Sequence, residues 1–179
     1  EILIAMDEAY IEFLEKPVDL LPRLRSGQQA NLLLMRTFSK IYGLAGLRLG
    51  YGLGHVELIA ALEKIRQPFN TNALVQAGAI AVLGDTEHVQ RTRQNNAVGL
   101  RFYEEGFRQL KLEWIPSAAN FILVRVGDGS RICQALQELG VIVRPMGGYA
   151  LPEWIRISVG TPLENQRCLA ALQRVLAAG

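Results

Sequence analysis

A lysine, two hydroxyl residues and an arginine lie close together in the segment RTFSKIYGLAGLRLGYG, residues 36–52. The planar guanidinium of Arg48 is suited to a phosphate group, and the hydroxyls of Thr37 and Ser39 add further donors. A nearby cation and partial burial disfavour the ammonium form of Lys40, and a neutral amine attacks carbonyl groups. The segment is therefore expected to hold a phosphorylated aldehyde, such as pyridoxal phosphate, as a Schiff base. The plain alternative is a solvent-facing turn with Arg48 in a surface ion pair.

A carboxylate follows directly after the apolar run of residues 2–6, as Asp7 in the segment ILIAMDEAY. The carboxyl ends of parallel strands face the ligand crevice of an α/β sheet, so Asp7 is expected beside a bound cofactor. A carboxylate there keeps a pyridinium nitrogen protonated, which pyridoxal chemistry requires. Tyr10 could contact the ring hydroxyl of the same cofactor. The alternative is that Asp7 only caps the segment that follows, since aspartate is common in turns.

Together these two segments resemble the fold-type I aminotransferases that use pyridoxal phosphate. The finer match, DEAYIEF followed by RTFSKIYGLAGLRLGYG, resembles the histidinol-phosphate aminotransferase family. The resemblance implies that Lys40 binds the cofactor covalently, that Asp7 pairs with its pyridine nitrogen and that Tyr10 contacts its ring oxygen. It also implies that the cofactor phosphate is held by Thr37, Ser39 and Arg48.

Three residues in the second half of the chain are candidates for substrate binding. Arg156 lies in an expected strand within GYALPEWIRISVGT, which resembles the family segment whose arginine binds the substrate α-carboxylate. Arg144 resembles the position that contacts the phosphate of histidinol phosphate, and Asn120 a position near the substrate. From the residues alone, Arg156 could equally extend its charged end into solvent, Arg144 could be a surface charge, and Asn120 could form a turn.

The reaction that the resemblance implies is transamination of histidinol phosphate with 2-oxoglutarate, giving imidazole acetol phosphate and glutamate, in histidine biosynthesis. Lys40 would move the proton between the substrate α-carbon and the cofactor. Two other activities of the same fold stay open, an aromatic amino acid aminotransferase and an O-phospho-threonine decarboxylase. A regulator whose aminotransferase-like domain only binds ligand is a further alternative, and a DNA-binding module upstream of residue 1 would support it.

The charge composition does not favour nucleic acid or membrane surfaces as partners. The 179 residues contain 19 Lys and Arg and 17 Asp and Glu, a formal net charge of +2, with no cluster of basic residues. This balance gives no argument for nucleic acid or an anionic membrane surface as partner. Cys133 and Cys168 are not expected to pair, His55 and His88 are expected at the surface, and no metal site is predicted. The expectation is a cytoplasmic enzyme, and the resemblance implies a homodimer.

The chain starts with Glu1 and enters a strand at once, without an initiator methionine. This start suggests a piece of a longer polypeptide, and the resemblance implies the C-terminal half of a chain about twice as long. Part of the cofactor pocket would then be supplied by the missing half. The 179 residues alone are expected to bind pyridoxal phosphate poorly and to be inactive.

The expected fold class is α/β. Residues 1–84 are interpreted as the C-terminal part of a cofactor-binding large domain with a mostly parallel sheet, and residues 85–179 as a small α+β domain that includes a long connecting helix. The continuously apolar strand at residues 31–35 is typical of a strand covered on both faces. Strands are expected at residues 2–6, 31–35, 47–53, 121–126, 141–143 and 154–159, and helices at residues 56–65, 73–83, 86–110, 130–139 and 163–176. On the helix at 86–110, Leu100 and Phe107 lie on one apolar stripe that Tyr103 helps to fill, and this stripe is expected to pack in the core.

Overall fold

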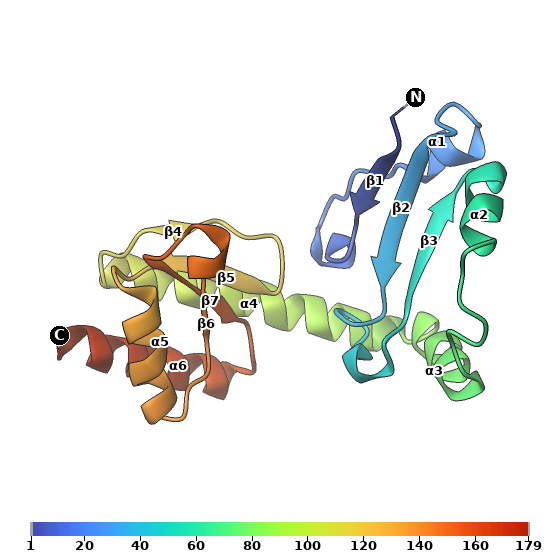
Figure 1. Ribbon diagram of the computed structural model, residues 1–179. Helices are drawn as coiled ribbons and strands as arrows, with labels where there is room; N and C mark the ends of the chain where they lie inside the picture. The colour runs from blue at the N-terminus through green and yellow to red at the C-terminus, as the bar shows by residue number, and fades with distance from the viewer. Residues whose placement is uncertain (1, 179) are drawn as a thin grey trace. The chain divides into compact units, whose positions relative to one another are not determined.

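The computed structural model describes residues 2–178 and divides the chain after Arg91 into two units (Figure 1). The first unit comprises residues 1–91 and the second residues 92–179. The division falls inside the long helix α4 (Thr86–Gln109), a few residues beyond the boundary that Gly84 suggested. Each unit is described by itself.

The first unit contains a three-stranded sheet in the order β1, β2, β3. Its strands are β1 (Ile4–Asp7), β2 (Leu32–Thr37) and β3 (Gly50–Gly54). β1 and β2 are parallel, with Asp7 opposite Met35, and β2 and β3 are antiparallel. The carboxyl ends of β1 and β2 therefore lie at the same edge of the sheet. The helical segments of this unit are η1 (Ile11–Phe13), α1 (Leu21–Arg25), η2 (Ala45–Leu47), α2 (Val56–Glu63) and α3 (Ala73–Leu83).

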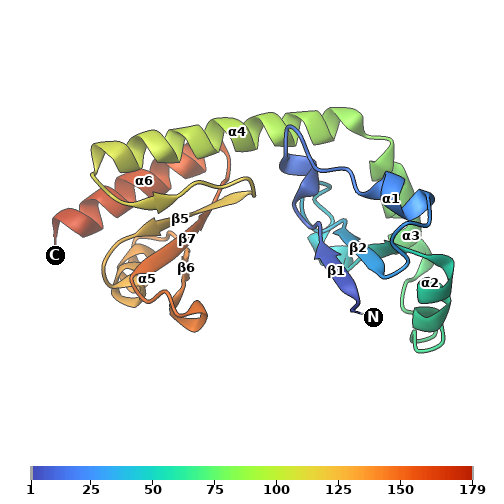
Figure 2. The same cartoon turned by 90° about the horizontal axis from the view of Figure 1, so that it is seen from above.

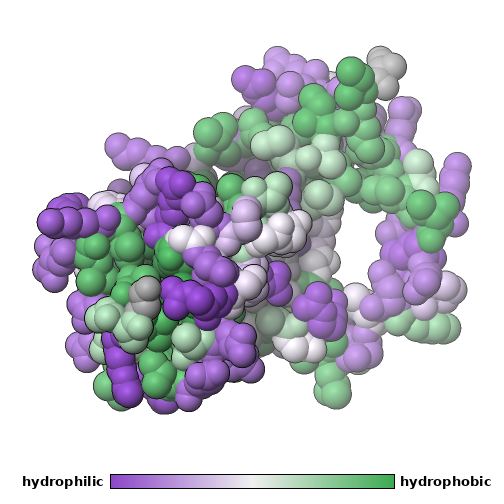
Figure 3. All heavy atoms as spheres, turned by 60° about the vertical axis from the view of Figure 1, so that its left-hand side comes forward, coloured by the Kyte–Doolittle hydropathy of each residue, from purple (hydrophilic) through white to green (hydrophobic). Residues whose placement is uncertain are grey.

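The two faces of β2 differ in burial. Leu32 and Leu34 are buried, whereas Leu33 is half-buried and Met35 is exposed, and all four side chains of β1 are exposed. The expectation that residues 31–35 are covered on both faces is therefore wrong for the described residues, because the side chain of Met35 is exposed. Hydrophobic atoms are visible at the surface in Figure 3, and the exposed apolar side chains of this unit include Ile2, Leu3, Val56, Phe69, Leu74, Ile80 and Leu83.

Side-chain caps fix where the two regular helices of this unit begin. The side chain of Asn72 accepts a hydrogen bond from the backbone N–H of Val75 at 3.0 Å, which starts α3 at the residue expected from the sequence. His55 caps α2 in the same way through Nδ1, which accepts from the N–H of Glu57 at 3.4 Å. Such caps satisfy backbone donors that have no partner inside the helix.

The second unit contains a four-stranded antiparallel sheet in the order β4, β5, β7, β6. The strands are β4 (Trp114–Ile115), β5 (Phe121–Arg125), β6 (Arg144–Pro145) and β7 (Trp154–Ser158). The helices are the C-terminal part of α4, α5 (Gly129–Glu138) and α6 (Pro162–Ala177), with a short turn η3 (Gly147–Tyr149) before β7. α4 and α6 run side by side in both ribbon views (Figures 1 and 2).

The core of this unit lies between the sheet and its helices. Leu100, Tyr103 and Phe107 face it from α4, as the helical spacing of apolar residues predicted, and Ile155 and Ile157 face it from β7. The expected strand at residues 141–143 is wrong, because the strand that pairs with β7 is Arg144–Pro145. The backbone N–H of Val141 instead donates to the carbonyl of Leu136 in α5. The apolar run 141–143 is thus used to close the helix.

Candidate functional site

A cavity of about 370 Å³ opens at the carboxyl ends of β1 and β2 in the first unit. Parallel strands place the residues that follow them at one edge of a sheet, which is where α/β proteins bind ligands. Five of the predicted cofactor residues therefore meet in one hollow, although they come from two separate segments. The residues that line it are Asp7, Ala9, Met35, Arg36, Thr37, Ser39, Lys40 and Arg48.

Asp7 ends β1 and turns the chain. Its Oδ1 accepts a hydrogen bond from the backbone N–H of Ala9 at 3.0 Å, so the turn-forming role weighed from the sequence is present. The side chain is nonetheless exposed and lines the cavity. One carboxylate oxygen is thus fixed by the turn, and the other remains available to a donor in the cavity.

Lys40 lies half-buried in the cavity wall, with Nζ 5.0 Å from the centre of the Tyr10 ring. A cation over an aromatic face is attracted by the ring quadrupole. Among residues 2–178 no carboxylate forms an ion pair with this lysine. The contact brings the predicted amine and the predicted ring-contacting tyrosine together, and it leaves the amine free of a salt bridge.

The hydroxyl of Thr37 is hydrogen-bonded within the protein, whereas among the residues described that of Ser39 is not. Thr37 Oγ1 accepts from the backbone N–H of Ser39 at 3.0 Å and donates to the carbonyl of Leu49 at 3.2 Å. The Thr37 hydroxyl therefore shapes the loop that carries Lys40. The Ser39 hydroxyl has no protein partner among the residues described, so it is the freer donor of the two.

Arg48 reaches the cavity from a strained backbone position. Its φ of 54° lies in the left-handed region, which non-glycine residues rarely adopt. One guanidinium nitrogen donates to the carbonyl of Ala45 at 2.8 Å, and the side chain is otherwise exposed. Backbone strain of this kind is often found at ligand sites. Here it turns a five-donor side chain toward the hollow that also contains Lys40 and Ser39.

His88 supports the loop that carries the lysine, a role that sequence reasoning missed. Its Nε2 lies 3.0 Å from the carbonyl of Ile41, the residue after Lys40, and it must donate because a carbonyl only accepts. The imidazole is half-buried, so the expectation of a surface histidine is wrong for His88. Because 47 positions separate the partners, no local pattern in the sequence could have indicated the contact.

Glu8 and Arg36 form a second contact that sequence reasoning missed. Nε of Arg36 donates to Oε2 of Glu8 at 2.8 Å, and the side chains are 18% and 6% exposed. Burial by itself lowers the pKa of the guanidinium, but hydrogen bonds with Glu8 and Tyr51 outweigh it and raise the pKa above its ordinary value. The guanidinium of Arg36 is therefore held in its charged form by this contact. The only hint in the sequence was that each is adjacent to a predicted site residue.

Two of the predicted substrate residues lie on one face of the sheet in the second unit. Arg156 of β7 is paired in register with Leu123 of β5 and with Arg144 of β6. Arg144 therefore lies inside a strand, and the expected position just past a strand is corrected. Its side chain is exposed, whereas that of Arg156 is half-buried.

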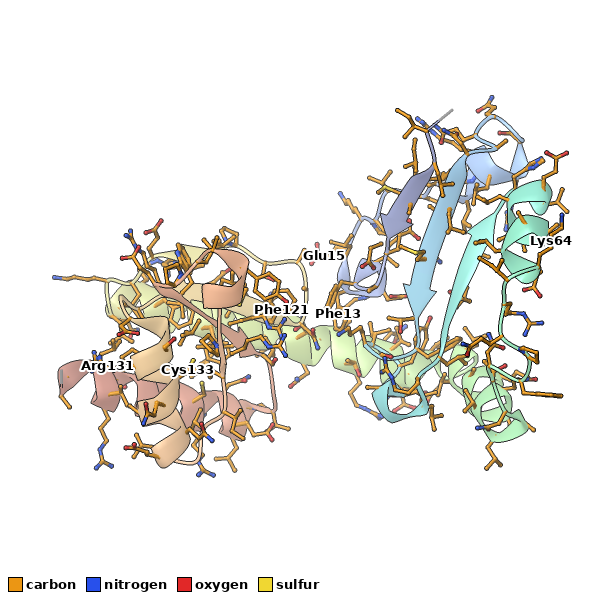
Figure 4. All side chains as sticks on the ribbon, in the orientation of Figure 1. Phe13, Glu15, Lys64, Phe121, Arg131 and Cys133 are labelled. Atoms are coloured by element: carbon orange, nitrogen blue, oxygen red, sulfur yellow. The ribbon has the colours of Figure 1, made fainter. Side chains whose placement is uncertain are left out.

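The guanidinium of Arg156 has an unsatisfied donor. Its carbon lies 4.9 Å from the centre of the ring of Phe121, which is labelled at the start of β5 in Figure 4. Its Nε is buried and has no hydrogen-bond partner among the described residues. Like charges opposite one another on neighbouring strands are destabilising, and a buried donor without a partner costs free energy. Arg156 and Arg144 together therefore form a site that an anion would stabilise.

Asn120 lies directly before β5, and its carbonyl accepts a hydrogen bond from the backbone N–H of Val159 at 2.9 Å. This contact places Asn120 at the end of the strand that carries Arg156. Its side chain is half-buried. The predicted residues thus form two groups, one in each unit.

Within residues 2–178, no group of three or more His, Cys, Asp or Glu side chains could hold a metal ion. None of the helices described is both long and apolar enough to span a bilayer. Both cysteines are free thiols, and burial raises the pKa of each.

The class I and II aminotransferases match residues 1–172 of the chain. The chain therefore belongs to the class I and II aminotransferase family, and the α/β fold class expected from the sequence is confirmed by the solved structures that resemble it. Among its relatives, it is 54% identical over 175 residues to a histidinol-phosphate aminotransferase of Akkermansia muciniphila, which covers 98% of this chain and 48% of the relative. It is 51% identical over 182 residues to histidinol-phosphate aminotransferase 2 of Ralstonia nicotianae, with the same coverage.

A solved structure agrees with these relatives. The histidinol-phosphate aminotransferase from Sinorhizobium meliloti, in complex with pyridoxal-5′-phosphate, superposes with a TM-score of 0.87 at 31% identity, over 98% of this chain and 49% of that one. The chain thus spans about half the length of the curated relatives that it matches.

Proposed function

We propose that the complete polypeptide containing this chain transfers an amino group between histidinol phosphate and 2-oxoglutarate, with pyridoxal phosphate as cofactor, in histidine biosynthesis. The observation that carries the proposal is that Asp7 and Lys40, which are far apart in sequence, line one cavity. The names of the relatives support the choice of substrate. Since the chain spans about half of each relative, the activity is proposed for the complete polypeptide.

The residues around the cavity fit pyridoxal phosphate. The free oxygen of Asp7 suits a protonated pyridine nitrogen, and the unpaired amine of Lys40 suits the aldehyde. Ser39 and Arg48 suit the phosphate, while Thr37 holds the loop between them. When bound, the cofactor supplies an electron sink for a carbanion at the substrate α-carbon.

Three of the chain's own residues would then act. Nζ of Lys40 would bond the cofactor and, once the amine of the incoming substrate has displaced it, would carry the proton that leaves the substrate α-carbon. Asp7 would keep the ring nitrogen charged, because a carboxylate beside a cation stabilises the charged form. Tyr10, whose ring lies against the amine of Lys40, would contact the ring oxygen of the cofactor.

Arg156 and Arg144 are proposed to bind the anionic groups of the substrates. The support is the buried, unsatisfied Nε of Arg156 and the second guanidinium opposite it. A guanidinium binds carboxylate or phosphate through two parallel hydrogen bonds. Histidinol phosphate has no α-carboxylate, so Arg156 would bind the carboxylate of 2-oxoglutarate or glutamate and tolerate phosphate in the other half-reaction. Asn120 is proposed to lie near the bound substrate.

The two units are proposed to be parts of the large and small domains of the complete enzyme, which would be a cytoplasmic homodimer. Exposed apolar side chains on α3, namely Leu74, Ile80 and Leu83, support an interface with a second copy. Burying such side chains is the dominant favourable term in association. A monomeric mass of the complete polypeptide by light scattering would refute the dimer.

The proposal is tested by borohydride reduction of the complete polypeptide in the presence of pyridoxal phosphate, followed by peptide mass spectrometry and an assay with histidinol phosphate and 2-oxoglutarate. We expect the pyridoxyl group on Lys40. We expect Lys40→Ala to lose the label and to reduce turnover by about 10³-fold or more, since it removes both a nucleophile and a proton carrier.

Lys64→Ala is the matched control, because this lysine is exposed at the end of α2 (Figure 4). It should keep both the label and the activity. A label on another lysine, or undiminished turnover by Lys40→Ala, would show that Lys40 is not the catalytic amine. A label on Lys40 without turnover of histidinol phosphate would favour a related activity or a ligand-binding regulator.

A further inference from the structure

The buried ion pair between Glu8 and Arg36 lies immediately next to the proposed cofactor site. Glu8 follows Asp7, and Arg36 precedes Thr37. The backbone N–H of Glu8 donates to the carbonyl of Met35 at 2.9 Å, which continues the ladder of β1 and β2 past the last residue of β1. The pair therefore joins two chain segments where they turn into the cavity.

The ion pair lies on the face of the sheet opposite to the side chain of Asp7. Side chains alternate along a strand, so Glu8 leaves on the other side from its neighbour Asp7. Arg36 also forms a hydrogen bond with Tyr51, whose ring centroid lies 5.6 Å from that of the buried Phe38. Only 18% of the Arg36 side chain and 6% of the Glu8 side chain are exposed, so the pair is largely removed from water.

Stability alone does not account for such a pair. Removing two charges from water costs about as much as their attraction returns, and apolar side chains of similar volume often do as well or better. What apolar side chains cannot supply is a carboxylate that cancels the charge of Arg36. This matters because Arg36 is one of the residues that line the cavity with Lys40 and Arg48, although its guanidinium turns to Glu8 on the other face.

We propose that Glu8 and Arg36 are a positioning pair in which the carboxylate neutralises the guanidinium. Of the two arginines that line the cavity among residues 2–178, only Arg48 would then present an uncompensated charge to Lys40 and a bound phosphate. The inference rests on the proposed function, because it concerns the site of pyridoxal phosphate. Without the carboxylate, Arg36 would add a second net positive charge to the residues that line the cavity with Lys40. A like charge disfavours the protonated form of a neighbouring nitrogen.

Other titratable groups surround the site and stay unchanged in the test. Those that face the cavity or the reverse of the sheet are Asp7, Tyr10, Arg48, Glu12, Tyr42, Tyr51 and His88. Because these groups keep their charges in the variants, a shift in the pH at which Nζ of Lys40 loses its proton reports the change of charge at the ion pair alone.

The experiment follows the visible absorption of pyridoxal phosphate bound to the complete polypeptide as a function of pH. The midpoint of the spectral change reports loss of the proton at Nζ of Lys40. We expect Glu8→Gln to lower this midpoint by about one pH unit, since an uncompensated charge at short range in a partly buried site has an effect of that order. Glu8→Gln combined with Arg36→Gln removes both charges and should restore the midpoint of the unmodified protein.

Two controls separate charge from packing. Arg36→Lys keeps the cation but not the planar fork, so it should lower the melting temperature of the cofactor-free protein and leave the midpoint in place. Glu15→Gln removes an exposed carboxylate from the following loop (Figure 4) and should change neither quantity. A midpoint in Glu8→Gln equal to that in Glu15→Gln overturns the inference, as does a double variant that stays shifted.

The outcomes also separate this inference from the proposed function. If the unmodified protein gives no absorption band and no label on Lys40, the proposed function fails. If it gives both and the variants show no charge-dependent shift, only the role of the ion pair fails. Should Glu8→Gln not fold by circular dichroism, Arg36→Gln takes its place, because it leaves the carboxylate of Glu8 uncompensated and should raise the midpoint. An unchanged midpoint in Arg36→Gln then overturns the inference.

Discussion

Substitution of Gly99 by alanine should destabilise the second unit, although alanine is the better helix former. Gly99 lies in the middle of α4, where the helix meets the chain that follows β7. A Cβ atom at this position would overlap Cγ1 of Val159 and lie 2.9 Å from Nδ2 of Asn165. Asn165 is buried and holds the loop after β7, because its Oδ1 accepts from the N–H of Gly160 at 2.8 Å. The substitution therefore strains the segment Val159–Gly160, which follows β7, the strand that contains Arg156.

Two opposing effects set the magnitude. Replacing glycine by alanine inside a helix favours folding by about 1 kcal/mol. Carbon atoms in contact are normally about 3.5–4.0 Å apart, so Val159 must move by a large part of an atomic diameter, and overpacking of a core costs about 1–3 kcal/mol. Taking the upper end, because the contact is an overlap, the net loss is about 2 kcal/mol. For a unit of this size that is about 10 °C in Tm.

Intrinsic tryptophan fluorescence during urea unfolding measures this loss selectively. The chain has two tryptophans, Trp114 and Trp154, and both are in the second unit. Val98→Ala is the matched control, because it changes the neighbouring, exposed position of the same helix and should alter the free energy of unfolding by less than about 0.5 kcal/mol.

A second substitution tests the cause. Val159→Ala removes the methyl group that a Cβ at position 99 would overlap, so the combination with Gly99→Ala should be more stable than the sum of the two single changes by about 1 kcal/mol or more. The steric reasoning is refuted if Gly99→Ala is as stable as the unmodified chain or more so. It is also refuted if the two substitutions are additive, because the strain would then not come from Val159.

Two further predictions concern the N-terminal cap of helix α6 and the side chain of Arg156 in β7. Thr161→Ala should cost about 1 kcal/mol, because Thr161 caps α6. Hydrogen bonds from the backbone and side chain of Thr161 lower the pKa of Glu164 below its ordinary 4.5. The ionised carboxylate therefore stabilises the folded state fully above the pKa of the unfolded chain, and this stabilisation is lost as the pH falls through the lower pKa of the folded state. Acid unfolding monitored by circular dichroism should therefore depend less on pH in the variant, and an unchanged profile would contradict the capping role. In the complete polypeptide, Arg156→Gln should raise the KM for 2-oxoglutarate about 10- to 100-fold, since a hydrogen bond between charged groups is lost. The control Arg131→Gln changes an exposed arginine on α5 and should leave this KM unchanged. Equal KM values for both variants would exclude Arg156 from the carboxylate site.

Local sequence was sufficient for several elements. α3 begins and ends at the expected residues, because Asn72 caps it through a hydrogen bond to a residue only three positions away. The stripe of Leu100, Tyr103 and Phe107 on α4 followed from helical spacing and is buried as expected. The segments that contain Asp7 and Lys40 could likewise be recognised, since each is a short run of residues with its own chemistry. In all of these, the decisive interactions lie within a few residues of one another.

Tertiary structure decided the contacts between distant residues. The strand expected at residues 141–143 moved to Arg144–Pro145, because pairing with β7 depends on register and an apolar run does not specify register. Only the folded chain placed His88 against the carbonyl of Ile41.

The sequence by itself thus determined which residues could do chemistry, and the fold determined which of them meet. Asp7 and Lys40 share a cavity because β1 and β2 are parallel and end at one edge. Glu8 and Arg36 pair for the same reason, because each follows by one residue the paired residues Asp7 and Met35. Arg156 faces Arg144 because antiparallel register sets them opposite each other. Such pairs are fixed by hydrogen bonds between strands that are far apart in the chain, and no pattern within a single segment carries that information.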